Sequence, residues 1–202
     1  MTAEAVAQER TRRPSLPDWV FPPSGGFVAE DLDRIPDLPA HTQLIDGSLV
    51  FVRPQGSFHM RVVSLLENEL RRAAPQDLRV RREMTIILGP TQRPEPDLIV
   101  IKAKAARDDD ETFYKAQDVV FAIEVVTPAS EGRDRHRKPQ LYAEAAIQHF
   151  WRIEKNADKP VVYAYELDPA TSSYALIGIH RECVKVTVPF DLAIDLTEID
   201  RL

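Results

Sequence analysis

Two apolar segments that each contain a carboxylate constrain this chain most strongly. The first runs from Asp97 to about Lys102, and the second from Phe121 to Val126. Both are rich in valine and isoleucine, a composition typical of strands that are covered on both faces of a sheet. Asp97 nevertheless opens the first strand, and Glu124 lies within the second. Because a carboxylate is costly to bury unless it is paired, protonated or bound to a cation, the two segments predict a functional site within a buried sheet.

The composition indicates a single globular domain. Of the 202 residues, 44% are hydrophobic and 29% are charged, which suffices for one sizeable core. The apolar runs are far shorter than the roughly 20 residues that span a bilayer, and the N-terminus lacks a hydrophobic signal region. The single cysteine, Cys183, excludes an internal disulfide and a cysteine-based zinc site. We therefore expect a cytoplasmic protein that does not enter the membrane.

The charge pattern bears on nucleic-acid binding. A formal net charge of −6 argues against a protein that coats nucleic acid by general electrostatics, but not against an enzyme with a local basic groove. The clearest basic cluster comprises Arg133, Arg135, Arg137 and Lys138. The phosphate backbone of DNA could lie there, although the interspersed Glu131 and Asp134 fit an ordinary helix surface equally well.

Turn and helix signals predict how the chain is organised. We expect an N-terminal tail and extended lead-in over residues 1–26 and one domain over residues 27–202. Asp46-Gly47 between two strand-like runs predicts a β-hairpin over residues 42–52, because glycine accepts positive φ. Helical spacing predicts a long helix that Ser57 caps and Pro75 ends, with further helices over residues 28–35 and 134–146. Strands are expected over residues 78–88 (one or two, antiparallel), 148–153, 161–167 and 173–179. This order predicts an α/β fold with a mixed sheet.

Asp97 and Glu124 suit a metal site if their strands are neighbours. Mg²⁺ takes oxygen ligands and commonly uses one or two carboxylates together with substrate phosphate and water. The backbone carbonyl of Val125 would complete the protein's share, and the metal would lower the pKa of a bound water. The alternative is structural, with Asp97 in a turn contact after Pro96 and Glu124 paired with a basic residue. Spacing alone favours this alternative slightly.

Lys138 is the candidate cation of the site, because the link from the Glu124 strand to its helix is short. A lysine beside a metal-bound water can orient the nucleophile or stabilise developing negative charge. Asp134 lies one helical turn earlier, so an exposed ion pair worth roughly 0.3–0.5 kcal/mol is the alternative. His59 at the start of the long helix and Glu83 before the first core strand are secondary candidates. Each of these two also suits a packed or solvated position.

Several short motifs together produce a family resemblance. They are Leu44-Ile45-Asp46-Gly47, Pro54 with His59, Glu83, Pro96-Asp97, Glu124-Val125-Val126-Thr127-Pro128, Asp134, Lys138, Tyr142 and Phe150-Trp151-Arg152-Ile153. From about Thr42 to the C-terminus, the chain resembles the Uma-two-type family of bacterial putative restriction endonucleases, a domain of unknown function.

The resemblance implies the restriction-endonuclease-like fold of the PD-(D/E)XK nuclease superfamily. There a mixed sheet flanked by helices presents an Asp and a Glu to Mg²⁺ or Mn²⁺, which correspond here to Asp97 and Glu124. The superfamily lysine falls at position 126, where this chain has valine. The family pattern instead supplies a lysine from the following helix, here Lys138. Two further departures, Thr127 for the usual serine and Ala146-Ile147 for a Gly-Val turn, remove no proposed ligand.

The residues and the resemblance together predict a divalent-metal-dependent phosphodiesterase that acts on DNA. Asp97, Glu124 and the carbonyl of Val125 would hold the metal, and Lys138 would position or polarise the water. A non-catalytic binding or assembly module that retains the nuclease fold is the main alternative, which the acidic net charge and the missing strand lysine favour. A hydrolase of another phosphoester is the third possibility. Edge strands and hairpins need covering, which favours a homodimer.

Overall fold

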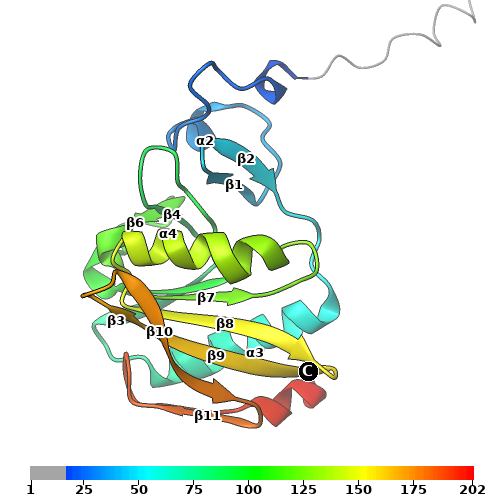
Figure 1. Cartoon of the computed structure of the whole chain (residues 1–202), viewed down its shortest axis with the longest axis vertical. Coiled ribbons are helices and arrows are strands. Elements are labelled where there is room, and N and C mark those ends of the chain that lie inside the picture. Colours follow the sequence, from blue (N-terminus) through cyan, green and yellow to red (C-terminus); the bar gives the residue numbers. More distant parts are fainter. Residues whose placement is uncertain (1–16) are drawn as a thin grey trace, which may run out of the picture.

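A six-stranded mixed sheet forms the centre of the molecule (Figure 1). The structure, a computed structural model, describes residues 17–202, so most of the predicted N-terminal tail lies outside the described residues. Along the sheet the strands are β10 (Ser173–His180), β9 (Lys159–Asp168), β8 (His149–Asn156), β7 (Val119–Val125), β5 (Leu98–Lys102) and β3 (Leu78–Arg82). Only β7 and β8 run parallel; the other neighbours are antiparallel. The predicted α/β fold with a mixed sheet is confirmed.

The long helix α3 (Ser57–Ala73) covers one face of this sheet. Its apolar stripe, which includes Val63, Leu66 and Leu70, is fully buried against the sheet. The helix begins after Gly56, so Ser57 is its first residue and the prediction of a Ser57 cap was wrong. It ends as predicted before Pro75, which disfavours helical backbone at the residue that precedes it. The strands β11 (Cys183–Val186) and β12 (Leu192–Asp195) and the 3₁₀ segment η5 (Leu196–Arg201) complete this layer.

Helix α4 (Lys138–Glu144) covers the opposite face and forms the crossover between the parallel strands β7 and β8. The π-helical turn η4 (Arg133–Arg137) leads directly into it, and the amide of Lys138 bonds to the carbonyl of Arg133, five residues earlier. Pro139 explains this widening, because its ring lacks an N–H and crowds the carbonyl four residues before it. No helix among residues 17–202 is long and apolar enough to cross a membrane.

The strand prediction for residues 78–88 was partly wrong. Strand β3 is antiparallel to β5 as expected, but β4 (Thr85–Ile87) leaves the central sheet and pairs in parallel with β6 (Phe113–Lys115). The side chain of Thr85 bonds to the carbonyl of Thr112, and Ile86 packs into the core beside Tyr114. The segment that connects β5 to β7 therefore contributes one short strand, β6. The 3₁₀ turns η2 (Ala103–Ala105) and η3 (Ala116–Asp118) flank this strand.

A separate hairpin stands over the α4 side of the molecule (Figure 1). It consists of β1 (Thr42–Ile45) and β2 (Ser48–Phe51), and the lead-in contributes η1 (Asp18–Val20) and α2 (Asp31–Arg34). Asp46 and Gly47 both have positive φ, 51° and 71°, as the predicted two-residue turn requires. Arg93, only 2% exposed, connects the lead-in to β4 by donating to Asp33, to Thr85 and to the carbonyl of Ala29, and its backbone pairs with Leu44 of β1.

Candidate active site

The register of β5 and β7 brings the two strand carboxylates together. Leu98 pairs with Ile123, so one step further along the antiparallel ladder Asp97 lies opposite Glu124. Residues directly opposite in such a pair are close enough for their side chains to interact. Ala122 packs on the face that α4 covers, and Glu124, two residues further along β7, lies on that same face, where Lys138 and Tyr142 contact it. The condition on which the metal-site hypothesis depended, that these strands are neighbours, is met.

Asp97 is held by two contacts from different elements. Nε2 of His59, in the first turn of α3, lies 2.9 Å from Oδ1 of Asp97, and the backbone amide of Val125 donates to Oδ2 at 2.6 Å. His59 is buried, whereas the Asp97 side chain remains 17% exposed. The structure thus places His59 beside Asp97, where its contact orients the carboxylate, and a role of His59 in catalysis stays a prediction.

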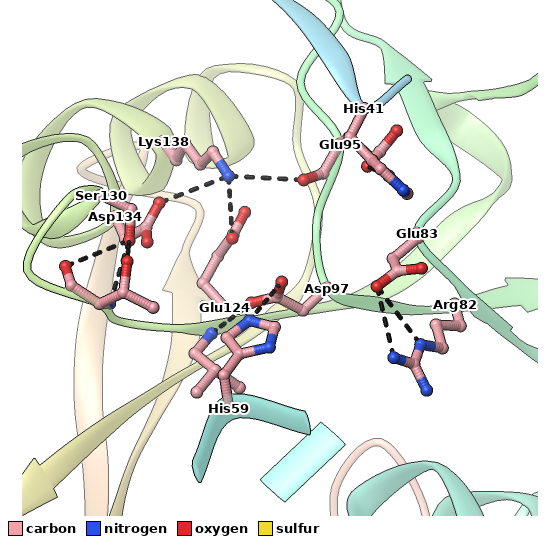
Figure 2. Close-up of polar contacts among 12 residues, drawn as sticks. His41, His59, Arg82, Glu83, Glu95, Asp97, Glu124, Ser130, Asp134 and Lys138 are labelled. Carbon is pink, nitrogen blue, oxygen red and sulfur yellow. Dashed lines mark hydrogen bonds and ion pairs between the residues drawn. The ribbon is translucent and has the colours of Figure 1, made fainter. Parts of the chain in front are cut away.

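Glu124 is the centre of a buried polar network (Figure 2). Nζ of Lys138 donates to its Oε2 at 2.9 Å, and the hydroxyl of Tyr142 donates to its Oε1 at 2.5 Å. The same ammonium lies 3.4 Å from Oδ1 of Asp134 and 3.5 Å from the carbonyl oxygen of Glu95. Because β7 leads through η4 into α4, a short stretch of sequence delivers Glu124, Asp134, Lys138 and Tyr142 to one place.

Burial and charge set the protonation of this network. Burial raises the pKa of Glu124 well above its usual range; Lys138 opposes this effect, and Asp134 and Asp97 add to it. Burial alone lowers the pKa of Lys138, but the charges of Glu124, Asp134 and Asp97 outweigh burial and raise it above its usual value. Lys138 is consequently a cation at neutral pH. It can donate hydrogen bonds and stabilise negative charge, but it cannot act as a general base.

A cavity of about 390 Å³ adjoins these groups. Asp97 and Glu124 line it from the sheet, Asp134 and Lys138 from η4 and α4, and His41 and Gln43 from the hairpin side. Two buried oxygens of this lining, Oε1 of Gln43 and Oδ1 of Asp134, accept no hydrogen bond, although Oδ1 of Asp134 takes part in the ion pair with Lys138. The cavity is thus rich in oxygen atoms with spare acceptor capacity.

The donor set fits a hard divalent cation such as Mg²⁺ or Mn²⁺. Each oxygen of Asp97 and Glu124 accepts one protein hydrogen bond, but an ionised carboxylate offers about four lone-pair positions. Among residues 17–202, no three His, Cys, Asp or Glu side chains gather as a ready-made metal cluster. Two carboxylates nevertheless match Mg²⁺ sites that rely on water and substrate phosphate for the remaining ligands. The carbonyl of Val125 stays a predicted ligand, because the contact that the structure gives at this residue is its amide bond to Asp97.

Glu83 lies at the cavity without joining the carboxylate pair (Figure 2). Its side chain is 34% exposed and pairs with Arg82, and its backbone amide donates to the carbonyl of Asp97. Its φ of 52° marks a strained turn after β3. The structure thus connects Glu83 to the site through the backbone, and a direct role for its side chain stays a prediction.

Sequence reasoning missed the pair formed by His41 and Glu95. Nδ1 of His41 lies 2.7 Å from Oε1 of Glu95, and both side chains line the cavity. The hydrogen bond to Glu95 raises the pKa of His41, and burial raises that of Glu95. Glu95 lies two residues before Asp97, so the alternation of an extended segment was a usable signal. His41 gave no comparable signal, because only the folded hairpin brings it near.

The predicted basic cluster is not a continuous free surface. Lys138 is buried in the Glu124 network. Arg135 pairs with Glu131 and Glu154, and Arg137 pairs with Asp46 across the hairpin turn. Arg133 has no carboxylate partner within 4 Å among the described residues. Three of the four members are therefore paired with carboxylates, and the interspersed Glu131 and Asp134 are partners of two of them, Arg135 and Lys138.

Comparison with known proteins identifies the family. A family model described as "Uma2: Putative restriction endonuclease" matches residues 29–197. The chain belongs to this family. Membership confirms the resemblance inferred from the motifs around Asp97, Glu124 and Lys138, and the family's description indicates a nuclease. No curated protein matches the sequence.

Solved structures support the fold. A crystal structure described as a putative nuclease belonging to DUF820, from Anabaena variabilis, superposes with a TM-score of 0.62 at 16% sequence identity. The match covers 86% of this chain and 97% of that chain. NucC from P. aeruginosa, in its cAAA-bound form, matches at a TM-score of 0.35 and 10% identity over 65% of this chain and 85% of that chain. The first likeness confirms the restriction-endonuclease-like fold class; the second is too distant to carry an argument.

Proposed function

We propose that this chain is a divalent-metal-dependent phosphodiesterase that cleaves DNA as an endonuclease. The observation that carries the proposal is the convergence of Asp97, Glu124 and Lys138 at one cavity, where the register of β5 and β7 sets the two carboxylates opposite each other. Burial of the Glu124 carboxylate in a core strand costs free energy. A catalytic role would explain why the chain, a member of a nuclease-like family, has a carboxylate there.

In the proposed mechanism, Asp97, Glu124 and the carbonyl of Val125 would hold Mg²⁺ or Mn²⁺. When bound, the cation supplies Lewis-acid stabilisation of the phosphoryl oxygens and a more acidic water. Lys138 holds a positive charge beside Glu124 and can release its longer contacts, at 3.4 and 3.5 Å, to donate to the attacking water or to the developing negative charge. His59 keeps Asp97 oriented.

The test is cleavage of plasmid and oligonucleotide DNA in Mn²⁺ by the wild type and by Glu124→Gln and Asp97→Asn. Both substitutions keep the size of the side chain, so the fold should persist while cleavage falls at least a hundredfold. Glu182→Gln, on an exposed turn, is the matched control and should cleave normally. Cleavage at the wild-type rate by Glu124→Gln would sink the assignment.

One observation favours a non-catalytic binding module as the second candidate. Every carboxylate oxygen of Asp97 and Glu124 already has a protein hydrogen-bond partner, and position 126 holds valine. If the wild type binds DNA but leaves it and other phosphoesters intact in Mn²⁺, this candidate replaces the nuclease. Hydrolysis of another phosphoester instead would retain the site and change the substrate.

The homodimer stays a prediction. Strand β10 is an outer edge of the six-stranded sheet, and it exposes Leu176, Ile177 and Ile179 by about half of their surface. An exposed apolar edge strand is a surface that proteins commonly cover. Sedimentation of the wild type and of Ile179→Lys measures whether it is covered by a second copy.

A further inference from the structure

The catalytic cavity continues into an outer groove of about 900 Å³. The two hollows share the lining residues Val52, Arg53, Pro54, Gln55, His59, Ser130 and Arg133. One side of the outer groove is the segment between β2 and α3, and the other is the loop from β7 to η4. Anything bound along this groove would therefore lead directly to Asp97 and Glu124.

Two arginines of this lining have no carboxylate partner within 4 Å among residues 17–202. Four arginines line the cavity or the outer groove, and Arg82 and Arg135 are paired with glutamates. Among the described residues, Arg53 has no ion pair, and Arg133 donates only to the carbonyl of Ala129, at 3.3 Å. Both lie where the cavity and the groove meet. Their positive charges would attract a bound anion and offset the repulsion between that anion and the carboxylates of Asp97 and Glu124.

The outer groove also offers apolar surface. Phe58 lines it beneath the ammonium of Lys155, which lies 5.4 Å from the ring centroid, and Pro128 and Ala129 are exposed along the opposite side. Cations that alternate with aromatic and apolar surface are what a single nucleic-acid strand needs, because phosphates take the charges and bases stack on the rings. Lys155 covers one face of Phe58 and the ring packs partly on the core, so unpaired bases would contact Pro128, Ala129 and the remaining surface of Phe58. The paired bases of a duplex would not present their faces to this surface.

We propose that the outer groove binds a single nucleic-acid strand and that Arg53 and Arg133 hold the phosphates beside the bond to be cleaved. The identity of that bond rests on the proposed function. Recession of the site supports single-strand access, because Glu124 is 1% exposed and the hairpin residues His41 and Gln43 form a second wall above it. An unpaired strand or a frayed end can enter edgewise between these walls.

The experiment measures binding without cleavage. Fluorescence anisotropy of a labelled 12-nucleotide strand, and of the same sequence as a duplex, is followed for the full-length chain in EDTA over a range of salt concentrations. We expect the single strand to bind about tenfold more tightly than the duplex. Arg53→Ala and Arg133→Ala should each weaken binding by about tenfold, the size of one charge-assisted hydrogen bond. Each should also reduce the slope of log K against log salt by about 0.7.

Matched variants test whether binding depends on the two groove arginines or only on the overall charge of the protein. Arg181→Ala removes the same charge at an exposed turn and should leave both affinity and slope unchanged. Arg53→Lys and Arg133→Lys should retain most of the slope of log K against log salt, because the positive charge is kept. Tighter binding of the duplex, no binding of either form, or an equal loss in Arg181→Ala would each overturn the proposal.

The outcome is distinguishable from failure of the proposed function. Cleavage in Mn²⁺ that depends on Glu124 but not on Arg53 or Arg133 would refute the groove and leave the nuclease standing. Strand binding that depends on both arginines, without cleavage of any substrate, would refute the nuclease and leave the groove standing.

Discussion

At the scale of single residues, the pair of Glu124 and Lys138 lies where apolar side chains would serve stability at least as well. Desolvation of a buried ion pair costs several kcal/mol per ion, and replacement of such pairs by packed apolar residues is often neutral or stabilising. Here the pair is almost completely buried, with Asp134 as a second acid. Its presence in the core of the sheet is therefore better explained by function than by folding.

Removal of Lys138 alone should destabilise the protein, because the buried carboxylates then lack a counter-charge. In Lys138→Met, Glu124 and Asp134 lose their counter-charge, and we expect the free energy of unfolding to fall by about 3–5 kcal/mol. Addition of Glu124→Gln should recover at least about 1 kcal/mol, because one uncompensated carboxylate is then gone while Tyr142 keeps an acceptor. Urea unfolding of the two single variants and the double variant gives this coupling. Lys104→Met, at an exposed position, is the control, and strict additivity would contradict the expectation.

At the scale of elements, the hairpin forms one wall of the site and depends on Arg93. This guanidinium is buried and joins the lead-in and its helix α2 to β4 through its bonds to Ala29, Asp33 and Thr85, while the backbone of Arg93 pairs with Leu44 of β1. We expect Arg93→Met to loosen the hairpin while the six-stranded sheet stays folded. Hydrogen exchange should show faster exchange of the amides in β1 and β2 but unchanged protection in β7 and β8. Arg93→Lys should rescue little, because a lysine cannot reproduce the two-pronged contact with Asp33.

The same contact predicts how acid affects the hairpin. The hydrogen bond from Arg93 lowers the pKa of Asp33 below its usual value. A lowered carboxyl pKa contributes stability that is present above the unfolded-state value and is lost as the pH falls through the lowered one. Below about pH 4, the protection of the hairpin amides, measured relative to their intrinsic exchange rates at each pH, should therefore fall in the wild type. Asp33→Asn should remove most of this pH dependence, and an unchanged acid response in that variant would contradict the assignment.

The same elements explain what the sequence could and could not predict. Apolar runs and the Asp46-Gly47 turn act locally, so the core strands and the hairpin were predicted close to their observed bounds. The parallel pairing of β4 with β6 involves strands of three residues, too short for a periodic signal. The role of Arg93 and the contact between His41 and Glu95 arise only from tertiary packing. Asp97 and Glu124 could be selected as candidate site residues from the sequence, because a charged residue in an apolar strand is costly to bury without a partner.

At the scale of the whole molecule, cation binding should appear as added stability. A ligand at ten times its Kd that binds only the folded state adds about 1.4 kcal/mol. For a chain of this length, that raises the Tm by roughly 3–6 °C. We expect Mn²⁺ in the millimolar range to produce this shift, because a site that awaits substrate phosphate holds metal weakly when alone.

Variants at the two carboxylates determine whether that shift reports the proposed site. Asp97→Asn and Glu124→Gln should each abolish the Mn²⁺-dependent rise in Tm, whereas Glu182→Gln should preserve it. Calorimetric titration of Mn²⁺ should give the same order, with saturable heat in the wild type and none in the two site variants. An equal rise in all four proteins would mean that the cation binds elsewhere on a chain of net charge −6. The carboxylates would then be structural, and the binding module would become the better account of the fold.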